Sequence, residues 1–209
     1  MTHTRIKICG ITRPEDALTA VACGADAIGL VFYGKSSRAV TIEQAAQIAS
    51  VVPPFVSIVA LFVDESELEI NNILASVPVD TIQFHGDESP EFCARFRRPY
   101  IKALRMRPDL DLPGACEAYA GSRGILLDTW REGVPGGTGK SFDWQLARLD
   151  LPLPVILAGG LNAENVAGAI KILHPAAVDV SGGVELTPGV KDPGKIAKFI
   201  AAVQAADQH

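Results

Sequence analysis

The sequence has few cysteines, and none of them is placed for a metal site or a paired redox site. The four cysteines, Cys9, Cys23, Cys93 and Cys116, form no Cys-x-x-Cys pair and no Cys/His cluster at zinc spacing. We therefore expect no metal and no disulfide framework. Free thiols suit a reducing compartment, so the sequence favours a cytoplasmic protein.

Long apolar runs and an excess of basic charge are also absent. No run of about 18 apolar residues occurs, the length that indicates a membrane-spanning helix, and the polar start of the chain does not resemble a signal peptide. The net charge of −5 argues against nucleic acid or a membrane surface as a partner, because both favour basic proteins. A small anionic ligand stays possible, since a phosphate site can be built from backbone N–H groups.

What the chain does contain is a succession of eight short apolar runs. They are nearly continuous in Val, Ile and Leu, which is typical of parallel strands buried on both faces. Longer amphipathic or Ala-rich segments separate them, as the crossover connections of a parallel sheet require. The runs are Ile6–Cys9, Ala27–Phe32, Ser57–Val63, Thr81–Phe84, Tyr100–Leu104, Ile125–Asp128, Val155–Ala158 and Ala177–Val180.

Helix-start signals mark most of the separating segments. Pro14-Glu15-Asp16 suits a first helical turn, and the Thr-x-x-Gln pattern at 41–44 is a capping box. A Pro-Gly pair weakens the prediction of a helix at Asp109–Ala120. The segment Gly133–Asp143 is expected to be a long loop before a short helix at Phe142–Arg148. The other expected helices are Pro14–Cys23, the stretch from Ile42, Ser66–Ser76, Ser89–Phe96 capped by Ser89, Asn162–Leu173 capped by Asn162, and Pro193–Ala206.

This alternation predicts an α/β protein with a single (β/α)8 barrel domain over residues 1–209. The competing architecture is an open, doubly wound sheet, which a Gly-x-Gly-x-x-Gly motif after the first strand would favour. Only Gly10 follows that strand, so the motif is missing there. In a barrel, the C-terminal ends of the strands and the loops after them face the active site.

Two of those loops carry paired glycines. Ala158-Gly159-Gly160-Leu161 follows the seventh run, and Ser181-Gly182-Gly183-Val184 follows the eighth. Phosphate sites in barrels often lie in these two loops, where glycine lets backbone N–H groups approach the anion closely. Simple turn formation is the alternative for either pair alone, but two pairs in these two loops favour a phosphate site.

Three side chains at strand ends are candidates for proton transfer. Cys9 ends the first run and shares its face with Lys7, so it is either an inert buried thiol or a base or nucleophile beside a cation. Asp128 ends the sixth run as either a structural cap for the next loop or a general acid or base. His85 follows the fourth run, and a lone histidine in such a loop is more often a hydrogen-bonded structural residue than a catalytic one.

The stretch from Gly136 to Ser141 imitates a phosphate-binding P-loop. The complete motif needs a further glycine five residues before Gly139, where this chain has Val134. The motif therefore fails, and we interpret the stretch as a mobile active-site loop.

Seven segments in register resemble the phosphoribosylanthranilate isomerase family of tryptophan biosynthesis. The resemblance extends from the first run to Lys191-Asp192, and although each segment alone is weak evidence, their common order is highly specific. The segments are Lys7–Thr12, Gly24–Phe32, Ile82–Glu88, Leu126–Asp128, Gly136–Gly139, Leu157–Leu161 and Val178–Glu185.

The resemblance implies an Amadori rearrangement of N-(5′-phosphoribosyl)anthranilate, without cofactor or metal. Asp128 would be the acid that protonates the furanose oxygen, and Cys9 the base that removes the proton from C2′. Arg38 falls where the family has an arginine for the anthranilate carboxylate. The positions implied for the phosphate are Gly159, Gly160, Ser181 and Gly182, and Asp179 matches a position near the sugar. The only partner expected is this small phosphorylated substrate, for a monomer or a homodimer.

Two departures from the family pattern concern the ligand contacts. Ser37 stands where the family usually has proline, which loosens the backbone before Arg38, and Gly182 stands where a serine is usual, which removes a hydroxyl group from the phosphate loop. Two related barrels, indoleglycerol-phosphate synthase and the histidine-pathway isomerase, are alternatives, but the latter uses paired aspartates where this chain has Cys9. A binding protein without catalysis is a third reading, against which the presence of both Cys9 and Asp128 argues.

Overall fold

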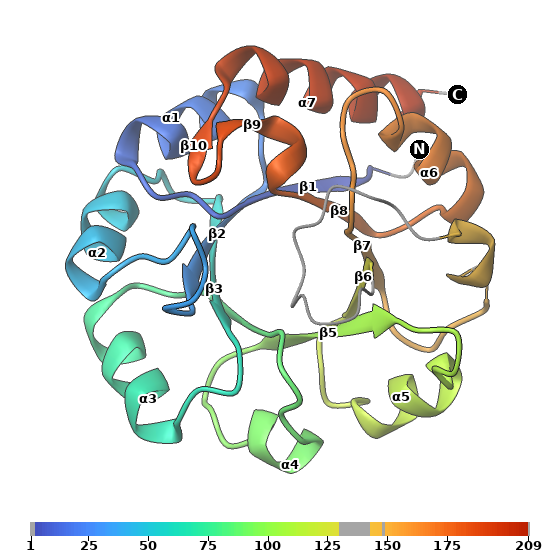
Figure 1. Cartoon of the computed structure of the whole chain (residues 1–209), viewed down its shortest axis with the longest axis horizontal. Helices are drawn as coiled ribbons and strands as arrows, with labels where there is room; N and C mark the ends of the chain where they lie inside the picture. The colour runs from blue at the N-terminus through green and yellow to red at the C-terminus, as the bar shows by residue number, and fades with distance from the viewer. Residues whose placement is uncertain (1–2, 130–142, 148, 209) are drawn as a thin grey trace.

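The computed structural model describes residues 3–129, 143–147 and 149–208, and its centre is a closed barrel of eight parallel strands in sequential order (Figure 1). This confirms the (β/α)8 architecture. The strands are β1 (Arg5–Cys9), β2 (Ala27–Phe32), β3 (Ser57–Phe62), β4 (Thr81–Phe84), β5 (Tyr100–Met106), β6 (Ile125–Thr129), β7 (Val155–Leu157) and β8 (Ala177–Val180).

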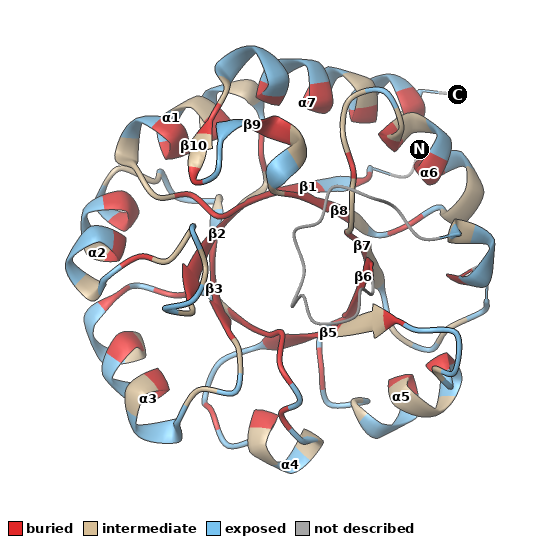
Figure 2. Cartoon of the chain, in the orientation of Figure 1, coloured by how far each residue is buried: buried red, intermediate tan, exposed pale blue. Residues whose placement is uncertain are grey.

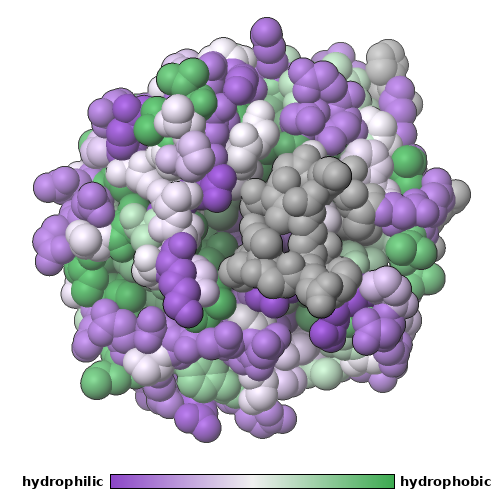
Figure 3. Space-filling model, in the orientation of Figure 1, coloured by the Kyte–Doolittle hydropathy of each residue, from purple (hydrophilic) through white to green (hydrophobic). Residues whose placement is uncertain are grey.

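Seven α-helices lie around the barrel among the described residues, and Figure 2 shows that their buried residues face the strands. Around the perimeter of the face seen in Figure 3, hydrophilic residues predominate, as the solvent side of such a ring requires. None of the described helices is long and apolar enough to cross a bilayer. The helices are α1 (Pro14–Cys23), α2 (Ile42–Ser50), α3 (Glu67–Ser76), α4 (Pro90–Cys93), α5 (Leu112–Ala118), α6 (Val166–Leu173) and α7 (Pro193–Asp207).

Three expected caps are present and one is not. The side chains of Thr41 and Gln44 form the complete capping box of α2, and Ser66 and Ser89 cap α3 and α4. Asn162 was expected to cap α6, which is wrong, since the helix begins four residues later at Val166. Asn162 Oδ1 instead accepts the backbone N–H groups of Glu164 and Asn165, so it shapes the turn that precedes the helix.

Other element boundaries also differ from the sequence expectation. Helix α4 stops at Cys93 instead of Phe96, whose ring leaves the helix to pack on Phe84 at 5.7 Å between centroids. Asp111 caps the shortened α5. Within the expected helix at Phe142–Arg148, the residues Trp144–Ala147 form a 3₁₀ turn, while Phe142 and Arg148 themselves lie outside the described residues. The expected glycine-rich loop and the Gly136–Ser141 stretch lie almost wholly outside the described residues.

The core has two layers that the barrel rule anticipates. Between strands and helices, large side chains such as Phe62, Phe84 and Phe199 are fully buried. Inside the barrel, alternate residues of the strands form a smaller apolar plug that includes Ile101, Leu126 and Ala158. Polar side chains at the C-terminal ends of the strands lie above this plug, which positions the site described next.

A short hairpin follows the barrel and reaches over its C-terminal end. After β8 the chain forms a 3₁₀ turn at Gly182–Val184, then β9 (Glu185–Thr187) and β10 (Val190–Lys191), which pair antiparallel. In Figure 1 this hairpin lies beside α1 and α7. Thr12 Oγ1 donates to the carbonyl of Gly189, and the backbone N–H of Lys191 donates to Asp16, so the hairpin is fastened to α1 and the loop before it.

Candidate active site

A cavity of about 600 Å³ opens at the C-terminal ends of the strands. This volume suits a single small ligand, because ligand pockets are commonly about 300–1,000 Å³. The structure brings all eight residues singled out from the sequence to its walls, although they come from five different strands and the loops after them. They are Cys9, Arg38, Asp128, Gly159, Gly160, Asp179, Ser181 and Gly182.

Cys9 lies next to a buried ion pair. Lys7 Nζ donates to Asp179 Oδ1 at 2.9 Å, and both side chains are buried. Lys7 and Cys9 lie two residues apart on β1, so their side chains share the inner face of the barrel, as expected. Gly29 on the neighbouring strand makes room for both, since a Cβ atom there would lie 2.8 Å from Cys9 Sγ and 3.0 Å from Lys7 Nζ.

Burial and neighbouring charges act in opposite directions on the pKa values of Cys9 and Lys7. Burial raises the pKa of the Cys9 thiol above its ordinary value of 9.0, and although the Lys7 ammonium acts to lower it, the net direction is upward. Burial alone would lower the pKa of Lys7, but the Asp179 carboxylate together with Cys9 outweighs it and raises that pKa. Lys7 is therefore a stable cation beside a thiol that is protonated at neutral pH.

Asp128 is held by hydrogen bonds on both carboxyl oxygens. The backbone N–H of Thr129 donates to Oδ1 at 2.7 Å, and His85 Nε2 lies 3.1 Å from Oδ2. The amide nitrogen of Gln83 lies 2.9 Å from His85 Nδ1, and because an amide nitrogen only donates, Nδ1 accepts and the ring proton lies on Nε2. The chain Gln83–His85–Asp128 thus fixes both the histidine tautomer and the plane of the carboxyl group.

The loop after β7 passes very close to Asp128. Gly159 has a φ of +83° and Gly160 a φ of +67°, a backbone conformation that favours glycine. A Cβ atom at Gly159 would overlap Thr129 Oγ1 and approach Asp128 Oδ1 to 2.9 Å. Glycine is therefore needed here for the approach of the loop to the end of β6, in addition to any contact with a ligand.

Arg38 is more firmly held than the sequence suggested. Its Nε and Nη2 atoms donate to Oε1 and Oε2 of Glu185, both at 2.7 Å, and its backbone N–H donates to Ser36 Oγ at 3.1 Å. The serine at position 37 was expected to leave Arg38 more flexible. A bidentate ion pair from the hairpin instead fixes the guanidinium group, which still lines the cavity.

Sequence reasoning missed Glu185, Lys191 and Gln83, and gave His85 little weight. Glu185 follows the Ser181–Val184 loop directly, yet nothing in one sequence shows that its carboxylate turns back to meet Arg38, 147 residues earlier in the chain. Gln83 and His85 lie two residues apart at the end of β4, so the period of a strand could have placed them on one face.

Among the described residues, no group of three or more His, Cys, Asp or Glu side chains could hold a metal ion.

A family model matches this chain over most of its length. Residues 6–202 match the model of N-(5′-phosphoribosyl)anthranilate (PRA) isomerase. A protein of this name from Pseudomonas putida (strain GB-1) is 59% identical over 206 residues, which cover 99% of this chain and 100% of the relative.

Solved structures show the same similarity. A phosphoribosylanthranilate isomerase in complex with reduced 1-(o-carboxyphenylamino)-1-deoxyribulose 5-phosphate has a TM-score of 0.85 and 41% identity. Monomers generated from the dimeric enzyme of Thermotoga maritima also have a TM-score of 0.85, with 40% identity. In both comparisons the match covers 97% of this chain and 99% of the other.

Proposed function

This chain belongs to the N-(5′-phosphoribosyl)anthranilate isomerase family, and we propose that its cavity performs the reaction by general acid/base catalysis with Asp128 as the acid and Cys9 as the base. The reaction is an aldose–ketose isomerisation of tryptophan biosynthesis, which converts N-(5′-phosphoribosyl)anthranilate to 1-(2-carboxyphenylamino)-1-deoxyribulose 5-phosphate. The observation that carries the proposed mechanism is that Cys9 and Asp128, 119 residues apart in the sequence, line the same cavity together with both glycine-rich loops.

The first step needs a positioned acid. Asp128 donates a proton to the furanose ring oxygen, the bond from C1′ to that oxygen breaks, and the nitrogen lone pair forms the C1′=N Schiff base. A protonated Asp128 can do this without turning, because His85 and Thr129 fix its carboxyl plane. Positioned proton donors of this kind contribute typically about 10²–10⁴-fold to the rate.

The second step needs a base on the sugar. The Cys9 thiolate removes the proton from C2′, and the electrons of the C–H bond form the C1′=C2′ bond of an enolamine as the iminium nitrogen regains its lone pair. The enolamine then loses its hydroxyl proton and gains a proton at C1′, which gives the ketone. Lys7 supports this step, since its cationic ammonium stabilises the thiolate that the step requires.

The remaining residues are proposed to hold the two anionic ends of the substrate. Gly159, Gly160, Ser181 and Gly182 surround the phosphate through the two loops after β7 and β8, the usual place for phosphate in such barrels. Arg38 binds the anthranilate carboxylate through the N–H groups that Glu185 leaves unused. Asp179 faces the sugar from β8, where its side chain pairs with Lys7.

An assay with freshly formed N-(5′-phosphoribosyl)anthranilate, followed by loss of its fluorescence, tests the mechanism through the Cys9→Ala and Asp128→Asn variants. Both should lose turnover while they still bind the reduced product analogue. Unchanged turnover in either variant would remove that residue from the mechanism.

We also propose a cytoplasmic, single-domain homodimer. The four cysteines are free thiols, which suits a reducing compartment such as the cytoplasm. The evidence for a homodimer is different. Phe55, in the loop between α2 and β3, is fully exposed at a positive φ of 72°. The Thermotoga maritima enzyme from which the 40% identical monomers were generated is dimeric. The exposed Phe55 side chain is proposed to pack against a second copy of this chain. Light scattering should give a dimer mass for the native chain and a monomer mass for Phe55→Glu, and a native monomer would contradict the proposal.

A further inference from the structure

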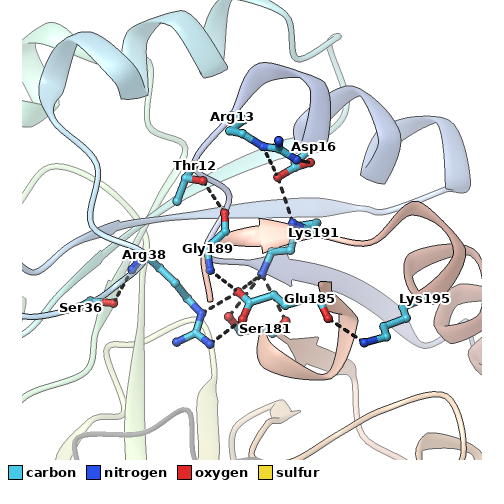
Figure 4. A network of polar contacts seen from close by, with 10 residues as sticks. All are labelled: Thr12, Arg13, Asp16, Ser36, Arg38, Ser181, Glu185, Gly189, Lys191 and Lys195. Atoms are coloured by element: carbon cyan, nitrogen blue, oxygen red, sulfur yellow. Dashed lines mark hydrogen bonds and ion pairs between the residues drawn. The ribbon is translucent and has the colours of Figure 1, made fainter. Parts of the chain in front are cut away.

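A buried ionic cluster lies behind Arg38, and Glu185 is its centre (Figure 4). Oε1 of Glu185 accepts hydrogen bonds from Arg38 Nε at 2.7 Å, Lys191 Nζ at 2.9 Å and the Gly189 N–H at 3.3 Å. Oε2 accepts from Arg38 Nη2 at 2.7 Å. The side chain of Glu185 is only 5% exposed, so this carboxylate is desolvated and depends on its donors.

Lys191 supplies the second cation of the cluster. Its side chain is 0% exposed, and its Nζ also donates to the carbonyl of Ser181 at 3.2 Å. Burial lowers the pKa of Lys191 although Glu185 acts to raise it, and burial alone would raise the pKa of Glu185, but Arg38 and Lys191 outweigh it and lower that pKa. Two cations therefore share one carboxylate, which leaves an excess of positive charge beside the cavity.

The way in which Glu185 holds Arg38 leaves part of the guanidinium group available. Arginine has five N–H bonds, and the side-on pair with Glu185 uses the one on Nε and one of the two on Nη2. No described residue uses either N–H bond of Nη1 or the second one of Nη2, and these can bind a second, end-on carboxylate. The stem of Arg38 lies across Gly10, where a Cβ atom would come within 2.5 Å of Cδ, so backbone and ion pair together fix its direction.

The same cluster touches the proposed phosphate loop. Lys191 Nζ lies within hydrogen-bond distance of the carbonyl oxygen and the Oγ of Ser181. A Cβ atom at Gly182 would lie 3.4 Å from Arg38 Nη2 and 3.9 Å from Glu185 Oε2. On the other side, a Cβ atom at Gly189 of the hairpin would lie 2.9 Å from the carbonyl oxygen of Ser37, the residue before Arg38. The hairpin thus connects the loop that presents Arg38 to the loop after β8.

We propose that Glu185 is the positioning residue of Arg38 and that, held in place by Lys191, it sets the specificity of the enzyme for a substrate with an ortho-carboxylate on its aromatic ring. This inference rests on the proposed contact between Arg38 and the anthranilate carboxylate. Without Glu185, the guanidinium group keeps its charge but loses the fixed fork that a bidentate carboxylate contact requires.

The test is a ratio of two dissociation constants, measured by calorimetry. One ligand is reduced 1-(o-carboxyphenylamino)-1-deoxyribulose 5-phosphate, and the other is the same molecule without its carboxylate. In Glu185→Gln, the preference for the carboxylated ligand should fall by about tenfold or more, with little change in the affinity for the other. Lys191→Met should lower the preference less, because it removes one donor to Glu185 and leaves the pair with Arg38 intact.

Glu88→Gln is the matched control for a merely structural effect. Glu88 is equally buried and also pairs with a buried lysine, since Lys102 Nζ lies 2.7 Å from its Oε2. This variant should lose stability and keep the ratio of the two dissociation constants. If Glu185→Gln behaves in the same way, or if both ligands lose affinity equally, the positioning role is wrong.

The Arg38→Lys variant separates the proposed contact between Arg38 and the carboxylate from the role of Glu185. It should abolish most of the preference for the carboxylated ligand, because lysine is a point charge without a fork. A preserved preference in Arg38→Lys would overturn the proposed contact between Arg38 and the carboxylate, and with it the role of Glu185. A lost preference in Arg38→Lys with a preserved one in Glu185→Gln and Lys191→Met would overturn the role of Glu185 alone.

Discussion

His85 donates a hydrogen bond from Nε2 to Oδ2 of Asp128 at 3.1 Å, and Gln83 fixes the ring so that the proton lies on that nitrogen. An isolated histidine after an apolar strand is more often structural than functional. Its hydrogen bond to the proposed acid gives His85 a positioning role, which no feature of the sequence around it specifies.

The His85–Asp128 bond is tested by two substitutions of different geometry. Glutamine can place an amide N–H near the position of Nε2, so His85→Gln should keep most of the turnover, whereas His85→Leu should lower kcat by about 10–100-fold with little change in KM. Steady-state kinetics of both variants provide the measurement. Equal losses in the two variants would show that the ring matters only for packing.

Removal of the proposed base should affect turnover and leave binding intact. Cys9→Ala should lower kcat by about 10²–10⁴-fold, the usual contribution of a general base, while the reduced product analogue still binds. Cys23→Ala is the matched control, because Cys23 is a free thiol at the end of α1, away from the cavity. A Cys9→Ala enzyme with native kcat would contradict the assignment.

The raised pKa of Cys9 predicts the direction of the pH dependence. Because burial raises this pKa above 9.0, the thiol is protonated at neutral pH. As long as the pH is below the pKa, each rise of one pH unit increases the thiolate fraction about tenfold. The rate at which iodoacetamide alkylates Cys9, located by mass spectrometry, should therefore rise from pH 7 towards pH 9, because the thiolate is the reactive form. A rate that is flat over this range would contradict the raised pKa of Cys9.

Gly159 should be intolerant of any side chain. Gly159→Ala places a Cβ against Thr129 and Asp128 at a φ of +83°, which costs about 1–2 kcal/mol from the backbone alone. We expect a lower melting temperature together with a lower kcat, since Asp128 must move. Gly168→Ala is the control, because Gly168 lies in α6 with open space around it and alanine should stabilise the helix by up to about 1 kcal/mol.

The buried pair of Lys102 and Glu88 should contribute to stability without affecting the reaction. Lys102→Met leaves the Glu88 carboxylate, only 2% exposed, without its cation, and breaking a buried pair in this way costs about 3–5 kcal/mol. Arg95→Ala removes an ion pair with Glu67 whose partners are 56% and 47% exposed, and it should cost less than about 1 kcal/mol. Denaturant unfolding measures both variants, and equal losses would contradict the assigned difference in burial.

Local patterns were sufficient to determine the architecture of this protein. Continuous apolar runs mark strands buried on both faces, and capping residues such as Thr41 and Ser66 act within one helical turn, so both can be recognised from neighbours in the sequence. The barrel rule then placed Cys9, Asp128 and the two glycine pairs at one end. The same local reasoning failed at Asn162, where two turn hydrogen bonds compete with the cap.

Only the tertiary structure decided which of these side chains act on one another. Arg38 and Glu185 meet because β8 closes the barrel against β1 and the hairpin after β8 folds back over the loop after β2. Lys7 with Asp179, and His85 with Asp128, are pairs of the same kind, each joining strands that are distant in sequence. The strength and direction of such contacts depend on distance and burial, and a single sequence carries neither for residues more than 40 positions apart.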